Sequence, residues 1–442
     1  MAIRSRLVLL SLLGVLVLPS REVLAQEAAT DLPAGVPDLD AWVERTLETF
    51  EVPGVAITIV KDGEVVLARG FGVRRIGEST PVDSRTRFGI ASNTKAFTAT
   101  ALGLLVEDGL LEWDASVIDY LPWFQMWDPW VTREITVRDL LVHRSGLGLG
   151  QGDLLYWPES DFTRREIVEA VRYLKPVTSF RSAYAYDNIL YHVAALVIEE
   201  VSGLTWEDFV QARIIEPLGM EDTRVTRAST LEEGNVATPH ARIEGTVRPV
   251  VPLAATATNA AGGINSTAAD MAKWLIVQLD SGRVSGSERI FSQRTTTQLW
   301  KPVTPLPIGR VPEGMEPMQA QFAGYALGFG IRDHRGQKMI THTGGLPGYV
   351  SRVTMIPGLK LGIAVLTNQE MGVAFESITN RILDHYLEAE PRDWITLFRD
   401  LQARRDSTVA ARDQSAAAER DSTSRPSLPL EGYAGTYRDA WY

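Results

Sequence analysis

Apolar runs near the two ends of the chain predict β-hairpins. Residues 54–72, GVAITIVKDGEVVLARGFG, are apolar on both sides of Asp62-Gly63, a pair that favours the type I′ turn of a tight hairpin. Residues 349–368, YVSRVTMIPGLKLGIAVLTN, show the same pattern with Pro357-Gly358 at the turn. The simplest way to bury both hairpins is to pair strands from the two ends of the domain in one antiparallel sheet.

The stretch between the hairpins is dominated by helical periodicity. Apolar residues recur at intervals of three and four, and a glycine ends most of the segments. The predicted helices are 94–109, 165–174, 188–203 and 267–282, with stops at Gly109, Gly203 and Gly282. This pattern predicts an α/β fold of the α+β type, with helices flanking the antiparallel sheet and a mostly helical lobe beside it. Small-molecule sites concentrate in clefts between lobes, so we expect the active site between the two.

The first 25 residues predict a secretory signal peptide. Arg4 and Arg6 precede an apolar run over 7–18, and Val23 and Ala25 provide small residues for cleavage after Ala25. The run is too short for a stable membrane span, with an uncleaved anchor as the alternative. We therefore expect a secreted or periplasmic protein with no stable span after cleavage.

The chain changes character after about residue 390, the end of a main domain expected over 36–390. Residues 391–428 are polar and alanine-rich without a sustained apolar face, which predicts a linker that is in part helical. Residues 429–442 read as a first β-strand, and a lone strand cannot bury a face. We expect this segment to be the start of a truncated C-terminal β domain.

Composition and charge narrow the functional classes. The chain is 45% hydrophobic and 22% charged, as in a soluble globular protein. The net charge of -11 and the lack of a basic stripe argue against a nucleic-acid partner. The absence of cysteine excludes disulfides and thiol catalysis. We expect no metal site, because His192, His240, His334 and His385 are not spaced in the sequence as metal ligands are. We expect no other cofactor either.

Three short motifs carry candidate chemistry, and each occurs once. They are Ser-x-x-Lys from Ser92 to Lys95 at a predicted helix start, Tyr-x-Asn from Tyr186 to Asn188 before a predicted helix, and His-Thr-Gly at 342–344 just before a predicted strand. Each alone has a structural explanation: Ser92 as a helix cap, Tyr186 as a core aromatic and His342 as a hydrogen-bonded strand residue. Together, however, the three motifs occur one in each structural region: a helix start, a loop of the helical lobe and the edge of the sheet. This distribution favours a catalytic site that the three regions share.

With these motifs in this order, the chain resembles the penicillin-recognising serine hydrolases. Within them it is similar to the class C β-lactamase-like branch, which includes D-alanyl-D-alanine carboxypeptidases, D-aminopeptidases and some esterases. The resemblance runs over 36–390, implies a β-lactamase/transpeptidase-like fold, and includes LLVHRSGL (140–147), EPLGMEDT (216–223) and AGGINSTAADMAKW (261–274). In the first of these segments we expect His143 to be a buried residue that bonds backbone and fixes the loop.

The resemblance implies an acyl-enzyme mechanism with Ser92 as the nucleophile. A serine hydroxyl needs an adjacent base. Lys95 lies three residues later on the same helix face and would lose proton affinity if buried. Tyr186 relays the proton to the leaving group or shares the role of base, and the sequence leaves open which of the two residues is the general base.

The remaining roles follow from the same resemblance. Asn188 is expected to hold the substrate carbonyl, and Thr343 and Gly344 to bring the sheet edge close to the substrate. The backbone N–H groups of Ser92 and Gly345 are expected to form the oxyanion hole.

The histidine at position 342 bears on the substrate class. Many relatives carry lysine there, and His342 is expected to lend a hydrogen bond or partial positive charge beside the nucleophile. A histidine with a pKa near 6.5 is mostly neutral at neutral pH, which argues against true β-lactamase activity. We expect an exported serine hydrolase that cleaves peptide, amide or ester bonds in small-molecule or peptide substrates, D-amino-acid peptides included. The alternatives are a true β-lactamase and a catalytically silent protein that binds penicillin or cell-wall fragments.

Overall fold

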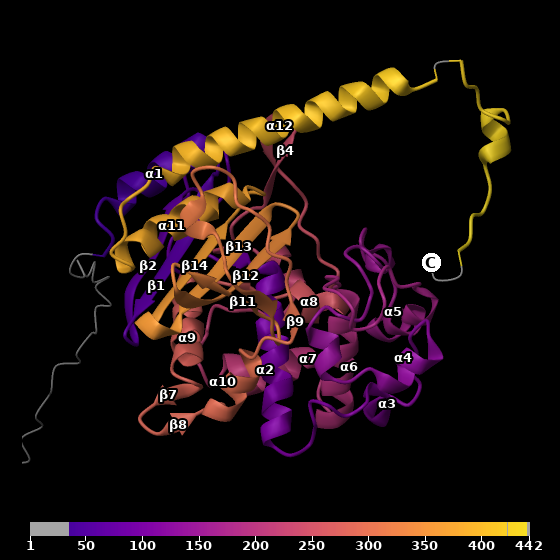
Figure 1. Cartoon of the computed structure of the whole chain (residues 1–442), viewed down its shortest axis with the longest axis horizontal. Coiled ribbons are helices and arrows are strands. Elements are labelled where there is room, and N and C mark those ends of the chain that lie inside the picture. The colour runs from indigo at the N-terminus through magenta and orange to yellow at the C-terminus, as the bar shows by residue number, and fades with distance from the viewer. Residues whose placement is uncertain (1–34, 422, 440–442) are drawn as a thin grey trace, which may run out of the picture. The chain divides into compact units, whose positions relative to one another are not determined.

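Strands from both ends of the chain pair in one antiparallel sheet, as the two hairpins predicted. The computed structural model describes residues 35–421 and 423–439, and eight strands of these residues form the sheet (Figure 1). In spatial order they are β2 (Glu64–Gly72), β1 (Gly54–Lys61), β14 (Leu361–Thr367), β13 (Tyr349–Ile356), β12 (Gln337–Leu346), β11 (Gly330–His334), β10 (Ala323–Tyr325) and β9 (Thr304–Pro305). β1 pairs with β14 and thereby joins the two hairpins. The predicted signal peptide, residues 1–25, lies outside the described residues.

Helices cover both faces of this sheet (Figure 1). The covering helices are α1 (Leu39–Phe50) and α11 (Gly372–Tyr386) on one face and α9 (Ala268–Leu279) on the other. Successive side chains of a strand point to opposite faces. Val55 and Ile57 of β1 accordingly pack in the cluster that contains α11, whereas Ala56 packs in the cluster that contains α9. Burial on both faces explains why β1 is apolar along most of its length.

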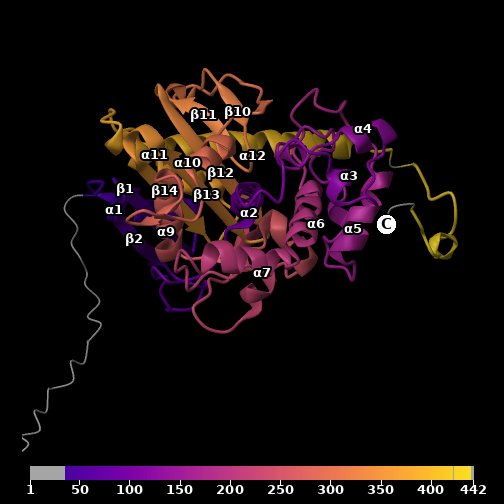
Figure 2. The same ribbon diagram turned by 90° about the horizontal axis from the view of Figure 1, so that it is seen from below.

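A helical lobe lies beside the sheet (Figure 2). Its helices are α3 (Val117–Tyr120), α4 (Pro129–Glu134), α5 (Arg164–Ala170), α6 (Ile189–Ser202), α7 (Trp206–Val210) and α8 (Asn259–Gly262). Helix α2 (Thr94–Glu107) contacts α6 and α8 of the lobe and also α10 (Gln293–Leu299), and nearly all of its residues are buried. The four helices predicted from periodicity correspond to α2, α5, α6 and α9.

The described part of the chain contains no single helix that is long and apolar enough to cross a membrane. Among residues 35–421 and 423–439, one pair of helical segments, α6 and 206–215, reaches that length and character together, and the two are bent by 76° relative to each other. Most residues of α6 are buried inside the lobe.

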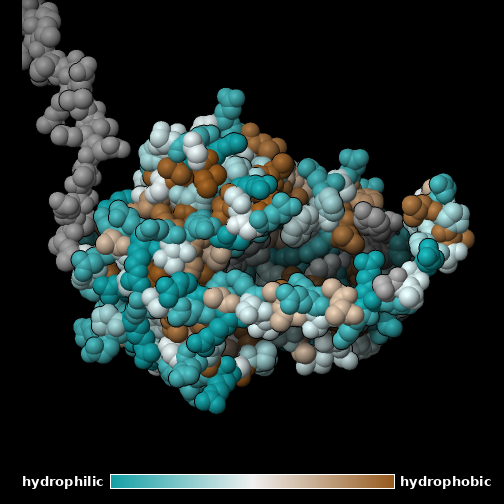
Figure 3. Space-filling view, turned by 90° about the horizontal axis from the view of Figure 1, so that it is seen from above, coloured by the Kyte–Doolittle hydropathy of each residue, from teal (hydrophilic) through white to brown (hydrophobic). Residues whose placement is uncertain are grey.

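Helix α12 (Trp394–Glu419) occupies most of the segment expected to be a polar linker. Its first turn buries Trp394, Ile395 and Phe398 in a small cluster with residues of α1 and α11. Residues 403–419 are exposed. On the face of the molecule seen from above, patches of hydrophobic residues lie among hydrophilic ones (Figure 3). The apolar first turn therefore belongs to the packed domain.

The strand expected after α12 is not found in residues 429–439. Leu430–Tyr433 form a short 3-10 turn, and the described residues of this segment are exposed. A strand with no neighbour has no partner for its backbone groups, which accounts for the difference.

The packed turn of α12 leads to a stability prediction. Trp394 is fully buried and its indole N–H donates a 2.6 Å hydrogen bond to Asp384 Oδ2. Trp394→Ala should lower the free energy of unfolding by about 3–5 kcal/mol, because it leaves a cavity and removes the hydrogen bond to Asp384 Oδ2, although Asp384 Oδ1 keeps its ion pair with Arg335. Chemical denaturation would measure this loss. The control is Val409→Ala on the exposed part of α12, expected within about 0.5 kcal/mol of wild type, and equal stability of both variants would contradict the assignment.

Candidate active site

The three motifs meet in one cavity of about 720 Å³ between the sheet and the helical lobe. Its wall includes Ser92, Tyr186, Asn188, His342, Thr343 and Gly345. Lys95 lies beneath Ser92 and is fully buried. The sequence thus correctly predicted which distant segments converge.

The His-Thr-Gly motif precedes a strand, β13, as predicted, but the motif itself lies in β12, a strand that was not predicted from the sequence. Gly344 is absent from the cavity wall, although it was expected to bind substrate. A Cβ at this position would lie 2.3 Å from the carbonyl oxygen of Ile90. The glycine therefore allows β12 to pack against the turn that carries the candidate nucleophile.

Ser92 lies in a 3-10 turn, Ala91–Asn93, that leads directly into α2. Ala91 has a left-handed φ of 50°, which costs a non-glycine residue roughly 1 kcal/mol. β13 holds the turn in place: Asn93 Nδ2 donates to Ser351 Oγ at 2.8 Å, and Ser351 Oγ donates to the carbonyl of Ile90 at 2.7 Å. The serine hydroxyl is thus presented by a backbone that the sheet fixes.

The amine of Lys95 has three oxygen partners. Nζ lies 3.0 Å from Ser92 Oγ, 2.8 Å from Asn188 Oδ1 and 2.9 Å from the carbonyl oxygen of Ala261. Burial is the main cause that lowers the pKa of Lys95 to about 7. A neutral amine has two hydrogens and one lone pair, and the two carbonyl oxygens can only accept. The lone pair of neutral Lys95 is therefore left for the hydroxyl hydrogen of Ser92.

Tyr186 contacts the same serine oxygen from the helical lobe. Its hydroxyl donates to Ser92 Oγ at 3.0 Å. Burial raises the pKa of Tyr186 above its ordinary value, so the phenol keeps its proton at neutral pH. Of the two groups beside Ser92, Lys95 is the one whose neutral form can accept a proton near pH 7.

Asn188 is held between Lys95 and an aspartate that sequence reasoning missed. Its Oδ1 accepts from Lys95, so its Nδ2 faces the carboxylate of Asp153 at 3.3 Å. This fixes the orientation of the amide and leaves one hydrogen of Nδ2 for another partner. Asp153 ends the glycine-rich stretch GLGLGQGD, residues 146–153, which signals irregular backbone but not a position in the active site.

His342 is a neutral hydrogen-bonding residue. Its Nδ1 lies 2.6 Å from the carbonyl oxygen of Thr343, so Nδ1 carries the hydrogen and Nε2 accepts from the hydroxyl of Tyr325 at 2.7 Å. Burial, with a smaller contribution from nearby Lys95, lowers the pKa of His342 to about 3. Of the two roles expected for His342, these contacts favour the hydrogen bond over the partial positive charge, because a buried imidazole without an anionic partner stays neutral. Tyr325 carries no local sequence signal.

Two further residues near the site are buried. His143 accepts a 3.2 Å hydrogen bond at Nδ1 from the backbone N–H of Asp187, which confirms its predicted structural role. Arg227, which was missed, bonds Thr258 Oγ1 at 2.8 Å and the carbonyl of Gly262 at 3.3 Å. No carboxylate pairs with Arg227 among the described residues, and its charge contributes to the lowered pKa of Lys95.

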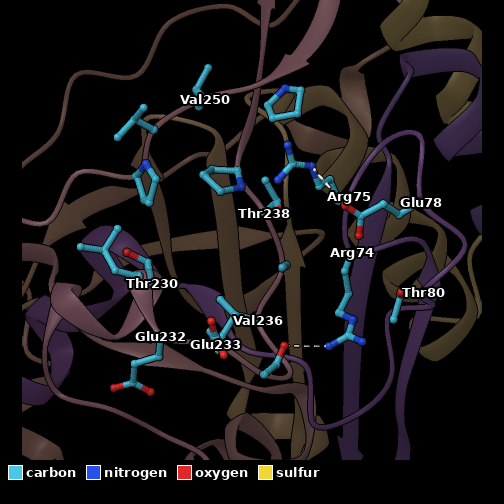
Figure 4. A pocket seen from close by; sticks show the side chains of 17 residues that line it. Arg74, Arg75, Glu78, Thr80, Thr230, Glu232, Glu233, Val236, Thr238 and Val250 are labelled. Carbon is cyan, nitrogen blue, oxygen red and sulfur yellow. Dashed lines mark hydrogen bonds and ion pairs between the residues drawn. The ribbon is translucent and has the colours of Figure 1, made fainter.

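A second cavity of about 770 Å³ shares no wall residue with the first. Figure 4 shows that Arg74, Arg75, Glu78 and Thr230 are among its side chains. Arg75 is paired with Glu78 at 3.4 Å, and Arg74 donates to the carbonyl of Gly234 at 2.9 Å. Arg75 and Glu78 thus pair with each other, Arg74 binds a backbone carbonyl, and the cavity contains none of the candidate catalytic residues.

Comparison with known proteins agrees with this geometry. A family model described as Beta-lactamase matches residues 39–387. The unguisins hydrolase ungD' of Aspergillus campestris is 29% identical over 426 residues, which are 90% of this chain and 75% of that protein. Penicillin-binding protein 4 of Amycolatopsis lactamdurans is 27% identical, covering 76% of this chain and 86% of that protein.

A solved structure shares the fold as well. The octameric penicillin-binding protein homologue from Pyrococcus abyssi superposes with a TM-score of 0.70 at 27% identity, covering 81% of this chain and 78% of that one. The predicted resemblance and fold class are confirmed.

The buried guanidinium of Arg227 gives a pH prediction. On the hypothesis that neutral Lys95 activates Ser92, the rate of Ser92 labelling by a fluorophosphonate should rise with pH through about 7. Arg227→Gln removes a positive charge that lowers the pKa of Lys95, and should move this midpoint upward by about 0.5 unit, or about 0.7 kcal/mol.

Two variants control this measurement. Arg227→Lys keeps the charge and should keep the midpoint, and Arg224→Gln removes an exposed arginine and should have no effect. A midpoint that is unchanged or lower in Arg227→Gln would contradict the role of this charge.

Proposed function

The chain belongs to the beta-lactamase family, and from this premise we propose that it is a serine hydrolase that forms an acyl-enzyme on Ser92 and cleaves peptide, amide or small ester bonds. The observation that carries the proposal is the hydrogen-bonded set of Ser92, Lys95 and Tyr186: Lys95 Nζ and the Tyr186 hydroxyl each lie 3.0 Å from Ser92 Oγ, and burial lowers the pKa of Lys95 to about 7. A nucleophile, a base and a proton donor on one oxygen suit acyl transfer.

In the proposed acylation, Lys95 takes the proton from Ser92 as Oγ attacks the substrate carbonyl carbon. The backbone N–H groups of Ser92 and Gly345 stabilise the negative oxygen that develops. When the tetrahedral intermediate collapses, Tyr186 donates its phenolic proton to the leaving nitrogen. The Lys95 ammonium then returns a proton to Tyr186. Water then attacks the ester at Ser92, with Lys95 again as the base.

The sheet offers an extended substrate a local free edge. β11 pairs with β12 only over residues 337–341, so in the described part of the chain residues 342–346 have a paired strand on one side only, β13. A peptide backbone can add to such an edge. Arg332 lines the same cavity, and the described residues provide no ion pair for it. Its guanidinium suits a carboxylate on the leaving group, which supports short peptides, D-amino-acid peptides included, as substrates.

Neutral His342 argues against efficient β-lactamase activity. The carboxylate of a β-lactam drug needs a firm cation at this position, and burial keeps this imidazole uncharged. A catalytically silent binding protein is also disfavoured, because it would not need a base beside the serine. We also propose, from the pattern of residues 1–25 alone, that the protein is exported.

A substrate panel tests the proposal. The panel contains D-amino-acid peptides, p-nitrophenyl esters and a chromogenic cephalosporin, and we expect turnover of the first two and slow hydrolysis of the third. Ser92→Ala should lower turnover by at least about 10³-fold and abolish fluorophosphonate labelling, whereas Ser407→Ala on the exposed part of α12 should change neither.

Each unexpected result of the panel has a distinct meaning. Labelling that persists in Ser92→Ala would reject the nucleophile. A stoichiometric burst without a steady state would indicate a silent binder, and fastest turnover of the cephalosporin would indicate a true β-lactamase.

A further inference from the structure

The helical-lobe side of the active-site cavity carries a carboxylate without a cationic partner. Asp153 lines the cavity, and its Oδ2 accepts from Asn188 at 3.3 Å while its Oδ1 accepts from the phenol of Tyr156. Both donors are neutral, and in the described residues no lysine, arginine or histidine forms an ion pair with Asp153. Burial raises the pKa of this carboxyl, as expected where no cation contacts it.

Holding Asn188 in place does not require this charge. A neutral acceptor would orient the Asn188 amide equally well, whereas a partly buried carboxylate carries a desolvation cost. The two hydrogen bonds also leave lone pairs of the carboxylate oxygens unused. A cationic group of a bound substrate would compensate the cost and use the free lone pairs.

The surroundings of Asp153 suit an organic cation. Leu149, Trp157 and Tyr184 line the same cavity, and Trp157 is half exposed. Aromatic rings attract cations through their faces, and they provide an apolar contact for the carbon atoms that carry the charge. On the sheet side of the cavity the charged side chains are instead guanidinium groups, Arg332 and Arg352.

Asp153 and Ser92 line the same cavity, so the carboxylate can meet a group of the substrate near the attacked carbonyl. Asp153 contacts Asn188, Asn188 contacts Lys95, and Lys95 contacts Ser92. An amino group on the α-carbon of the acyl group lies about 2.5 Å from the scissile carbonyl carbon. Such a group stays close to Ser92 when the carbonyl is attacked, and the lobe side offers it a carboxylate.

We propose that Asp153 is a specificity residue that selects acyl groups with a positive charge beside the scissile carbonyl, such as the free α-ammonium of an amino-acid amide or of a peptide N-terminus. This inference rests on the proposed function and deepens it. It assigns the enzyme to the hydrolysis of amides at a free amino terminus, and it predicts that acyl groups blocked at that nitrogen are poorer substrates.

A matched pair of substrates tests the role of the charge. D-alanine p-nitroanilide and its N-acetyl derivative differ only in the ammonium group, and both can be assayed at pH 7.5. We expect wild type to show the higher kcat/KM on the free amine. Asp153→Asn should lower kcat/KM on the free amine by roughly 10–100-fold, as for a lost hydrogen bond to a charged group, and should change the N-acetyl substrate by less than about threefold.

Controls make each outcome decisive. Asp161→Asn, an exposed aspartate outside the cavity, should leave both substrates unchanged. Fluorophosphonate labelling of Ser92 reports whether Asp153→Asn is folded. If it is not, wild type alone tests the proposal with a third substrate, the N-succinyl derivative, which should be slower than the N-acetyl one.

Several results would overturn the inference. Equal losses on both substrates in Asp153→Asn would mean that Asp153 only positions Asn188, and no loss on either would remove its role in specificity. A wild-type preference for the N-acetyl substrate would refute the inference while leaving Ser92 as the nucleophile of a hydrolase. Absence of turnover on the whole series, together with an unlabelled Ser92, would instead refute the proposed function.

Discussion

The amine of Lys95 is completely buried and lies within 3.0 Å of three oxygen atoms, two of which are carbonyl oxygens that can only accept hydrogen bonds. Burial disfavours the charged form of the amine, and the two carbonyl oxygens occupy the two hydrogens of its neutral form. The lone pair is then directed at Ser92. This arrangement of the Lys95 amine makes Ser92 a candidate nucleophile. The other features of the site either hold the amine in this arrangement or depend on it.

The fold maintains this arrangement by bringing distant segments around one amine. Helix α2 provides Lys95 itself, Asn188 comes from the start of α6, and Ala261 comes from α8. The same burial keeps His342 neutral, so the cavity has no cation at the position where many relatives carry lysine. Its charged groups lie instead on opposite walls, with Asp153 on the lobe and Arg332 on the sheet, and this distribution underlies the proposed preference for substrates with charges on both sides of the scissile bond.

The sequence predicted those features that depend on local pattern or on motifs. Periodicity located the hairpins and helices, and the order of three motifs predicted the convergence of Ser92, Lys95, Tyr186 and Asn188. Tyr325, Asp153 and Arg227 were missed because their roles depend on contacts with residues distant in sequence. The neutrality of His342 likewise depends on its burial, and the sequence around a single strand residue does not reveal how deeply that residue is buried. The close approach of Gly344 to Ile90 was also not foreseen, because the motif does not show which of its residues packs against the turn before Ser92.

Direct titration of Lys95 tests the central claim without any substrate. The protein labelled with ¹³C at lysine Cε would be titrated and followed by NMR, with Lys95→Arg used to assign the resonance. A buried lysine that titrates near pH 7, apart from the exposed lysines, is the result this account predicts. A Lys95 resonance that titrates above pH 10 with the others would show a charged amine beside Ser92, and would contradict the account.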